Sequence, residues 1–210
     1  MPMTSKQTPL VRDAESLARR LLADDSDRFA HCRYSAGIAE LAADALGLQD
    51  SDALIAAAWL HDIGYVPSLA MTGFHPLDGA LRLASEGWPD ETVLLVAHHS
   101  HADLLARYFG VENQLTVLDH ASGEAEDILT YADLRSGTTG MGAVPEQRIA
   151  EMRRGHSKNP TVPKEVREGR YDLLLAAANR VSDALNARPN GWSSRRRSRV
   201  TSLSGSRLGD

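Results

Sequence analysis

The sequence predicts an all-α protein in a single domain, and three observations indicate this. Almost every patterned segment places its apolar residues at steps of three and four, the period of one helix face. No stretch shows a convincing period-two alternation of β-branched residues. A chain of 210 residues is long enough for one substantial domain but too short for two large ones. We therefore expect a helical domain over residues 8–187, a disordered N-terminus over 1–7 and a basic disordered tail over 188–210.

Apolar stripes predict the first two helices, and a cap followed by an apolar run predicts the third. The stripes consist of Leu10, Ala14, Leu17, Ala18, Leu21 and Leu22 for the first helix, and of Ile38, Leu41, Ala42 and Ala45 for the second. Asp50, Ser51 and Asp52 offer an N-cap for the third helix, whose residues 53–60 are all apolar. Because that helix has no polar face, we expect it to be buried on all sides.

Five further helices are predicted in the rest of the chain. They cover residues 76–86, about 89–108, about 124–135, about 145–154 and about 164–187. Pro89 stands at the first-turn position of the second of these. Residues 137–145 and 155–163 are punctuated by Gly, Pro and Asn and are expected to form loops. A domain boundary at 137–145 is an alternative, but it would need a core that neither side obviously has.

Composition predicts a soluble cytoplasmic protein that does not enter a membrane. The longest apolar run is far below the roughly 18 to 20 residues of a membrane-spanning helix, and the N-terminus has no stretch of signal-peptide type. Cys32 is the only cysteine, which excludes an internal disulfide and suits a reducing compartment. The net charge is −5, and residues 191–210 carry five arginines and one acid. The rest of the chain is therefore acidic, which makes broad nucleic-acid binding unlikely.

A group of histidines and aspartates stands at the ends or on the buried faces of the predicted apolar helices. The group consists of His31, His61, Asp62, His98, His99 and Asp133. A single histidine on an apolar face is usually a core residue bonded to a carbonyl. Several imidazoles and two buried carboxylates from separate helices are best satisfied around a cation, because an unpaired buried carboxylate is costly. Mixed imidazole and carboxylate ligands suit Mn²⁺, Fe, Co²⁺, Ni²⁺ or Zn²⁺, as one or two ions.

The order His31, His61-Asp62, Asp133, with "AAAWLHDIGY" around the pair, resembles the HD-domain superfamily of metal-dependent phosphohydrolases, HDIG type. The resemblance covers about residues 27–136 and implies the family's helical bundle. It implies that the primary metal ligands are His31, His61, Asp62 and Asp133. "FHPLDGALRLA" and "VAHHS" are similar to the further histidine positions of two-metal members, which adds His75, His98 and His99, and Asp62 would then bridge the ions.

The resemblance implies hydrolysis of a small phosphate ester, such as a nucleotide or dinucleotide. Asp62 would also accept a proton from the attacking water. The substrate-binding cations expected on or after the helix of Asp133 are Arg135, Arg148 and Arg154, with Arg153 beside them and Arg28 before His31. A small phosphorylated substrate is the expected partner, with a homodimer as a possible assembly.

Departures from the family's motifs keep two alternatives open. Many HDIG-type members have a lysine after the tetrapeptide, where this chain has Tyr65. The Glu-Asp pair of guanosine tetraphosphate hydrolases is missing, as is the Gly-Tyr-Pro motif of cyclic-di-GMP phosphodiesterases. The segment "ADLRSGTTGMGAVPEQRIAEMRRGH" resembles one that follows the last aspartate in some members. The alternatives are a non-catalytic HD-type module that binds a nucleotide or a partner, and an HD-like di-iron oxygenase.

Overall fold

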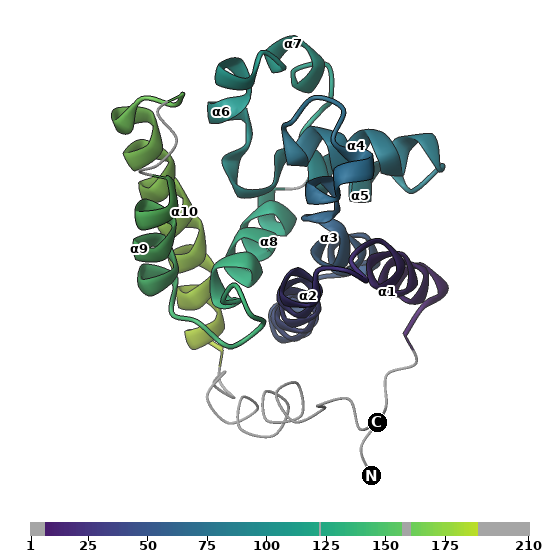
Figure 1. The fold of residues 1–210 in the computed structure, drawn as a ribbon. Helices are drawn as coiled ribbons and strands as arrows, with labels where there is room; N and C mark the ends of the chain where they lie inside the picture. Colours follow the sequence, from purple (N-terminus) through teal and green to yellow (C-terminus); the bar gives the residue numbers. More distant parts are fainter. Residues whose placement is uncertain (1–6, 122, 157–160, 189–210) are drawn as a thin grey trace.

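The computed structural model describes residues 7–121, 123–156 and 161–188, and within these ranges the fold is all-α, as predicted (Figure 1). The described part contains no β-strand and only one isolated bridge, between Ser136 and Gly142. None of the helices in these ranges is long and apolar enough to cross a membrane. The predicted N-terminal disorder over residues 1–6 and the predicted basic tail from residue 189 lie outside the described residues.

The helices follow one another with short connections. In chain order they are α1 Pro9–Leu21, α2 Ser26–Leu46, α3 Asp52–Leu60, α4 His75–Ser85, α5 Asp90–His98, α6 Asp103–Ala106, α7 Glu112–Leu115, α8 Gly123–Arg135, α9 Pro145–His156 and α10 Lys164–Asn186. Short 3-10 turns connect several of them, at Ile63–Tyr65, Pro67–Leu69, His99–His101 and Arg107–Phe109.

The apolar helix α3 lies at the centre of the packing. It contacts α1, α2 and α5, while α8 packs between α2 and α10 (Figure 1). All eight of its residues from Ala53 to Leu60 are buried, as its lack of a polar face predicts. The hydrophobic cluster around it runs from Val11 in α1 to Leu185 in α10 and includes side chains on both sides of the 137–145 loop.

Local signals explain where the first helices begin and end. The Thr8 side chain accepts a hydrogen bond from the backbone N–H of Val11 and caps α1, and the Asp25 carboxylate accepts one from Arg28 and caps α2. Gly47 ends α2 in the left-handed region, with φ of 74°. The Asp25 cap fixes the start of α2, and therefore the position of His31 in the second turn of that helix.

One predicted helix is wrong. The helix expected over about 89–108 stops at His98 and is followed by the 3-10 turn and the short α6. Ser100 and His101 both have positive φ, 55° and 52°, a conformation that non-glycine residues rarely adopt. The cause is tertiary, because both the side chain and the carbonyl of Ser100 are bound by residues from distant helices. This break redirects the chain just where the adjacent histidines stand.

Candidate metal centre

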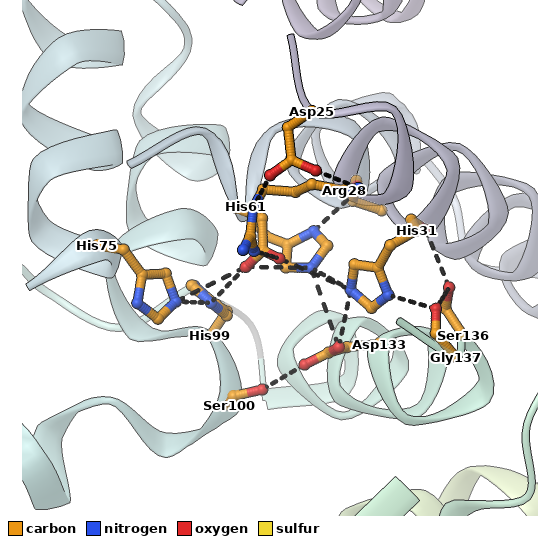
Figure 2. Close-up of polar contacts among 12 residues, drawn as sticks. Asp25, Arg28, His31, His61, His75, His99, Ser100, Asp133, Ser136 and Gly137 are labelled. Atoms are coloured by element: carbon orange, nitrogen blue, oxygen red, sulfur yellow. Dashed lines mark hydrogen bonds and ion pairs between the residues drawn. The ribbon is translucent and has the colours of Figure 1, made fainter. Parts of the chain in front are cut away.

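Three helices and the ends of two more bring four histidines and Asp133 together beside Asp62. His31 projects from α2, His61 and Asp62 directly follow α3, and Asp133 comes from the last turn of α8 (Figure 2). His75 is the first residue of α4, and His99 is the first residue after α5. The ligand atoms form two groups of three, each within 4.8 Å of one another: one of His31, His61 and Asp133, and one of Asp62, His75 and His99.

The first group is held closely together. Nε2 of His31 lies 3.1 Å from Nε2 of His61 and 3.2 Å from Oδ1 of Asp133. His61 Nε2 is 4.0 Å from the same Asp133 oxygen. Three ligand atoms from α2, α3 and α8 therefore face a common point (Figure 2).

The second group is built in the same way and is linked to the first by Asp62. Nε2 of His75 lies 3.2 Å from Nε2 of His99. Oδ1 of Asp62 is 3.7 Å from His75 Nε2, 4.0 Å from His99 Nε2 and 3.7 Å from His61 Nε2. This single carboxylate oxygen therefore lies near ligand atoms of both groups.

Backbone carbonyls determine which ring nitrogen of three histidines faces the site. Nδ1 of His31 contacts the Gly137 carbonyl at 3.2 Å, Nδ1 of His61 the Ala58 carbonyl at 3.0 Å, and Nδ1 of His99 the Val96 carbonyl at 2.7 Å. Because a carbonyl can only accept, each Nδ1 must carry the proton and donate. In a neutral ring Nε2 then carries a lone pair. The Nε2 atoms of neighbouring histidines therefore face one another and the carboxylate oxygens with no proton between them.

Such an arrangement is unfavourable unless a positive charge lies between the facing atoms. This is the pattern of metal-binding histidines, whose second nitrogen donates to a carbonyl or carboxylate. The residues present therefore fit one or two divalent cations, and the mixture of imidazole and carboxylate ligands suits Mn, Fe, Co, Ni or Zn. This cluster could therefore hold such ions.

The protonation states agree with a cation-binding site. Burial alone would raise the pKa of the Asp62 carboxyl, but the nearby charges of His61 and His31 hold it well below its usual range. Burial likewise opposes ionisation of Asp133. When no cation lies between them, His31 is the group that takes a proton on Nε2, and its hydrogen bond and charge hold the pKa of Asp133 well below the ordinary value. Both carboxylates are therefore ionised at neutral pH.

The histidines of the two groups differ in their affinity for a proton. Burial lowers the pKa of His99 to about 4, helped by the charge of His61, and burial beside His99 holds the pKa of His75 well below its ordinary value. Burial also opposes protonation of His31, but the hydrogen bond and charge of Asp133 outweigh it and raise the pKa of His31. His75 and His99 thus remain neutral at pH 7, the protonation state in which an imidazole can bind a metal ion.

Arg28 and Tyr65 form one wall of the site. An Arg28 terminal nitrogen lies 2.8 Å from Oδ2 of Asp62, and its Nε lies 3.2 Å from Asp25. The guanidinium stacks over the ring of Tyr65 at 3.9 Å, and Tyr65 stacks on His75 at 3.8 Å. Tyr65, which stands where many HDIG-type proteins have lysine, therefore supports a ligand histidine and the cation that pairs with Asp62.

A cavity of about 720 Å³ opens onto the cluster. Its polar lining includes three arginines, Arg28, Arg148 and Arg170, and five of the six ligand residues: His31, Asp62, His75, His99 and Asp133. Its apolar lining includes Phe74 and Phe109, whose rings lie 4.9 Å apart. A volume of this size is within the range of small-molecule sites.

The prediction that His98 joins the ligands does not agree with this geometry. Its Nδ1 lies 2.8 Å from Oδ1 of Asp103, and its Nε2 donates to the Leu118 carbonyl at 3.2 Å. The ring stacks on His120 at 4.1 Å, away from the cavity lining. The reason is that adjacent side chains at the end of a helix point in different directions, so His99 reaches His75 while His98 lies against Asp103.

Of the three arginines predicted to bind substrate, one lines the cavity and two do not. Arg148 lines the cavity, and its Nε is buried without a hydrogen-bond partner among the described residues. Arg135, half-buried near the end of α8, and Arg154, exposed on α9, do not line the cavity. Arg153 pairs with Glu168 at 2.7 Å instead.

Two contributors to the site were not singled out from the sequence. Ser100 donates from Oγ to Oδ2 of Asp133 at 2.7 Å, and Arg170 lines the cavity from α10. Arg170 precedes Leu174, Ala178 and Val181 on the buried stripe of α10, so a charged residue on an apolar face was the available signal. Ser100 offered no comparable signal, because its place depends on the unpredicted break.

An all-helical fold with two His/Asp groups beside one cavity defines a helical protein whose residues could hold a metal ion. The chain belongs to the HD-domain family: the HD domain matches residues 28–149, which include the His31, His61-Asp62 and Asp133 positions. The family is generally one of metal-dependent phosphohydrolases. No curated protein and no solved structure matches the chain significantly.

Proposed function

We propose that this protein is a metal-dependent phosphohydrolase that acts on a small phosphate ester such as a nucleotide or dinucleotide. The observation that carries the proposal is the orientation of His31, His61 and His99. Each donates from Nδ1 to a backbone carbonyl and aims Nε2 at carboxylate oxygens beside a cavity. A histidine that only filled the core would not need a second imidazole nitrogen within about 3 Å of its own.

The residues of the two groups would hold the metal. His31, His61 and Asp133 would bind one ion, and His75 and His99 a second, with Asp62 between them. The chemistry that such ions supply is activation of water at neutral pH and neutralisation of charge on the phosphoryl oxygens.

Asp62 is better suited to binding the cations than to accepting a proton. Its pKa lies well below the usual range, so it is ionised throughout the neutral region and is a weak base. Arg28 binds Oδ2 at 2.8 Å, which leaves Oδ1 directed toward the histidines of both groups. We therefore propose Asp62 as the shared ligand.

The lining of the cavity is complementary to a substrate that has one charged and one apolar part. Arg148 approaches the centre from α9, and its charge acts on both His31 and Asp133. Phe74 and Phe109 provide an apolar surface large enough to contact a ring of the substrate. A phosphate ester with an aromatic or nucleoside leaving group would satisfy both parts.

The proposal is tested by stripping the purified protein with a chelator and reloading it with Mn²⁺. Hydrolysis of p-nitrophenyl phosphate, bis(p-nitrophenyl) phosphate and a panel of nucleotides is then measured. We expect activity that depends on the metal and is lost in His61→Ala and Asp62→Ala. His120→Ala is the matched control, because this exposed histidine does not line the cavity.

The outcomes separate the proposal from its alternatives. Metal binding without turnover of any ester would favour a non-catalytic binding module. Iron content with oxygen consumption and no ester hydrolysis would favour an oxygenase. Unchanged hydrolysis in His61→Ala and Asp62→Ala would remove this cluster from the reaction altogether.

A further inference from the structure

Arg170 is a buried cation that faces the cavity from outside the family segment. It lies on α10, beyond residues 28–149, and only 7% of its surface is exposed. It precedes Leu174 by one turn on the buried stripe of its helix. Its place among the cavity-lining residues puts its guanidinium on the same cavity as Asp133 and Ser100.

One hydrogen bond fixes the orientation of the guanidinium. Nε of Arg170 donates to the Ser100 carbonyl at 2.7 Å. Ser100 in turn has φ of 55° and donates from Oγ to Oδ2 of Asp133 at 2.7 Å. Because Nε is used on the strained turn, the two terminal amino groups are the donors that remain.

The other cavity arginines have carboxylate partners, whereas Arg170 has none in the part of the chain that the structure describes. Arg28 pairs with Asp25 and Asp62, and Arg148 contacts Glu151 at 3.4 Å. No carboxylate oxygen of the described ranges lies within 4.0 Å of the Arg170 nitrogens, although the charge of Asp133 reaches it. A buried charge without a partner is unfavourable, and arginine stays protonated even when burial lowers its pKa.

A tetrahedral oxyanion in the cavity would meet the remaining donors. The planar fork of arginine matches the oxygen spacing of phosphate and can bind two oxygens at once. The contact with Ser100 holds the fork before any ligand arrives, so little side-chain freedom is lost on binding.

We propose that Arg170 binds the phosphoryl group of the substrate through its terminal amino groups, as a substrate-binding residue that α10 adds to the HD domain. The anion site follows from a buried guanidinium that has no carboxylate partner among the described residues, and its assignment to the substrate's phosphoryl group rests on the proposed function. Arg170 also has a positioning part, since its Nε holds the turn that carries His99 and Ser100.

The test uses inorganic phosphate as the probe and the full-length, Mn²⁺-loaded protein. Phosphate binding is measured by isothermal titration calorimetry for the wild type, Arg170→Gln and Arg180→Gln. We expect Arg170→Gln to weaken binding by roughly 10- to 100-fold, the effect of losing hydrogen bonds to a charged group. Arg180→Gln is the matched control on the same helix, because Arg180 is exposed and pairs with Asp127 away from the cavity.

Arg170→Lys and a measurement of bound Mn²⁺ separate anion binding from the support of the turn. Lysine keeps the charge in the cavity, so we expect phosphate binding to fall less than in Arg170→Gln while the Mn²⁺ content stays at the wild-type level. If both variants lose Mn²⁺ in proportion to phosphate, Arg170 only holds the turn and the anion site is overturned.

The remaining outcomes distinguish this inference from the proposed function. Equal phosphate affinity in wild type and Arg170→Gln, or no phosphate binding by the wild type, overturns the anion site. Phosphate binding that depends on Arg170 in a protein that hydrolyses no ester supports the anion site and rejects the hydrolase. Ester hydrolysis that Arg170→Gln leaves unchanged rejects the inference and retains the hydrolase.

Discussion

Gly64→Ala tests how the HDIG glycine positions the second ligand group. Gly64 lies in the 3-10 turn that follows Asp62 and packs against the start of α4. A Cβ added there would lie 2.0 Å from the carbonyl oxygen of His75 and 2.8 Å from the backbone nitrogen of Gly79. Both are backbone atoms, so no flexible side chain can move aside.

The size of the effect follows from these contacts. An ordinary contact begins at 3.4 Å, so the turn and α4 would have to separate by about 1.4 Å at His75. Overpacking of this kind typically costs about 1–3 kcal/mol of unfolding free energy. A ligand displaced by about 1 Å can lower activity by roughly 100-fold. Because His31, His61 and Asp133 do not lie on α4, we expect the first group to keep its metal.

The assay combines urea unfolding with metal analysis of the Mn²⁺-loaded protein. Gly169→Ala is the control, because a Cβ at this exposed position in α10 meets no atom within 4 Å. Alanine is favoured over glycine inside a helix, so this variant should be more stable by about 0.5–1 kcal/mol. The reasoning is refuted if Gly64→Ala unfolds at the wild-type urea concentration and binds the wild-type amount of metal.

Three further predictions concern other contacts. Ser100→Ala removes the hydrogen bond to Asp133, and a metal titration should show affinity reduced by about 10- to 100-fold; wild-type affinity would contradict this role. Cys32 is fully buried, and burial raises its thiol pKa, so Ellman's reagent at pH 8 should react only when urea unfolds the protein; rapid labelling of folded protein would disagree. Burial opposes protonation of His98, but the hydrogen bond and charge of Asp103 outweigh burial and raise the pKa of His98. Burial opposes ionisation of Asp103, but its contact with His98 outweighs burial and lowers the pKa of Asp103. The ion pair between His98 and Asp103 therefore contributes fully to the free energy of unfolding between roughly pH 4 and 6.5. This contribution is lost as the pH rises through the folded-state pKa of His98. Urea unfolding of Asp103→Asn against pH should show its largest deficit in that window, and a deficit independent of pH would exclude this account.

Much of the fold is predictable because helical periodicity and caps are local. The all-apolar run of α3 predicted a fully buried helix. The prediction of a helix over 89–108 was wrong because it, too, relied only on local periodicity. Its apolar pattern continues past His98, but contacts with Asp133 and Arg170, 33 and 70 positions from Ser100, break it.

The histidine pair shows the limit of sequence order for a site. Counting residues cannot decide between His98 and His99, because the two are adjacent and follow the same apolar run. The packing around the end of α5 decides it, because α4 places His75 beside His99 while Asp103 lies beside His98. A difference of one position thus depends on which neighbouring segments pack against each face of α5.

The sequence by itself determined the helical class, the buried α3 and the family motif of His31, His61-Asp62 and Asp133, because these depend on spacing along single helices and on the order of residues. Only the tertiary structure decided the geometry of the second ligand group, the place of His98 and the approach of Arg170. Those features depend on hydrogen bonds and packing between segments far apart in the chain, which no local pattern encodes.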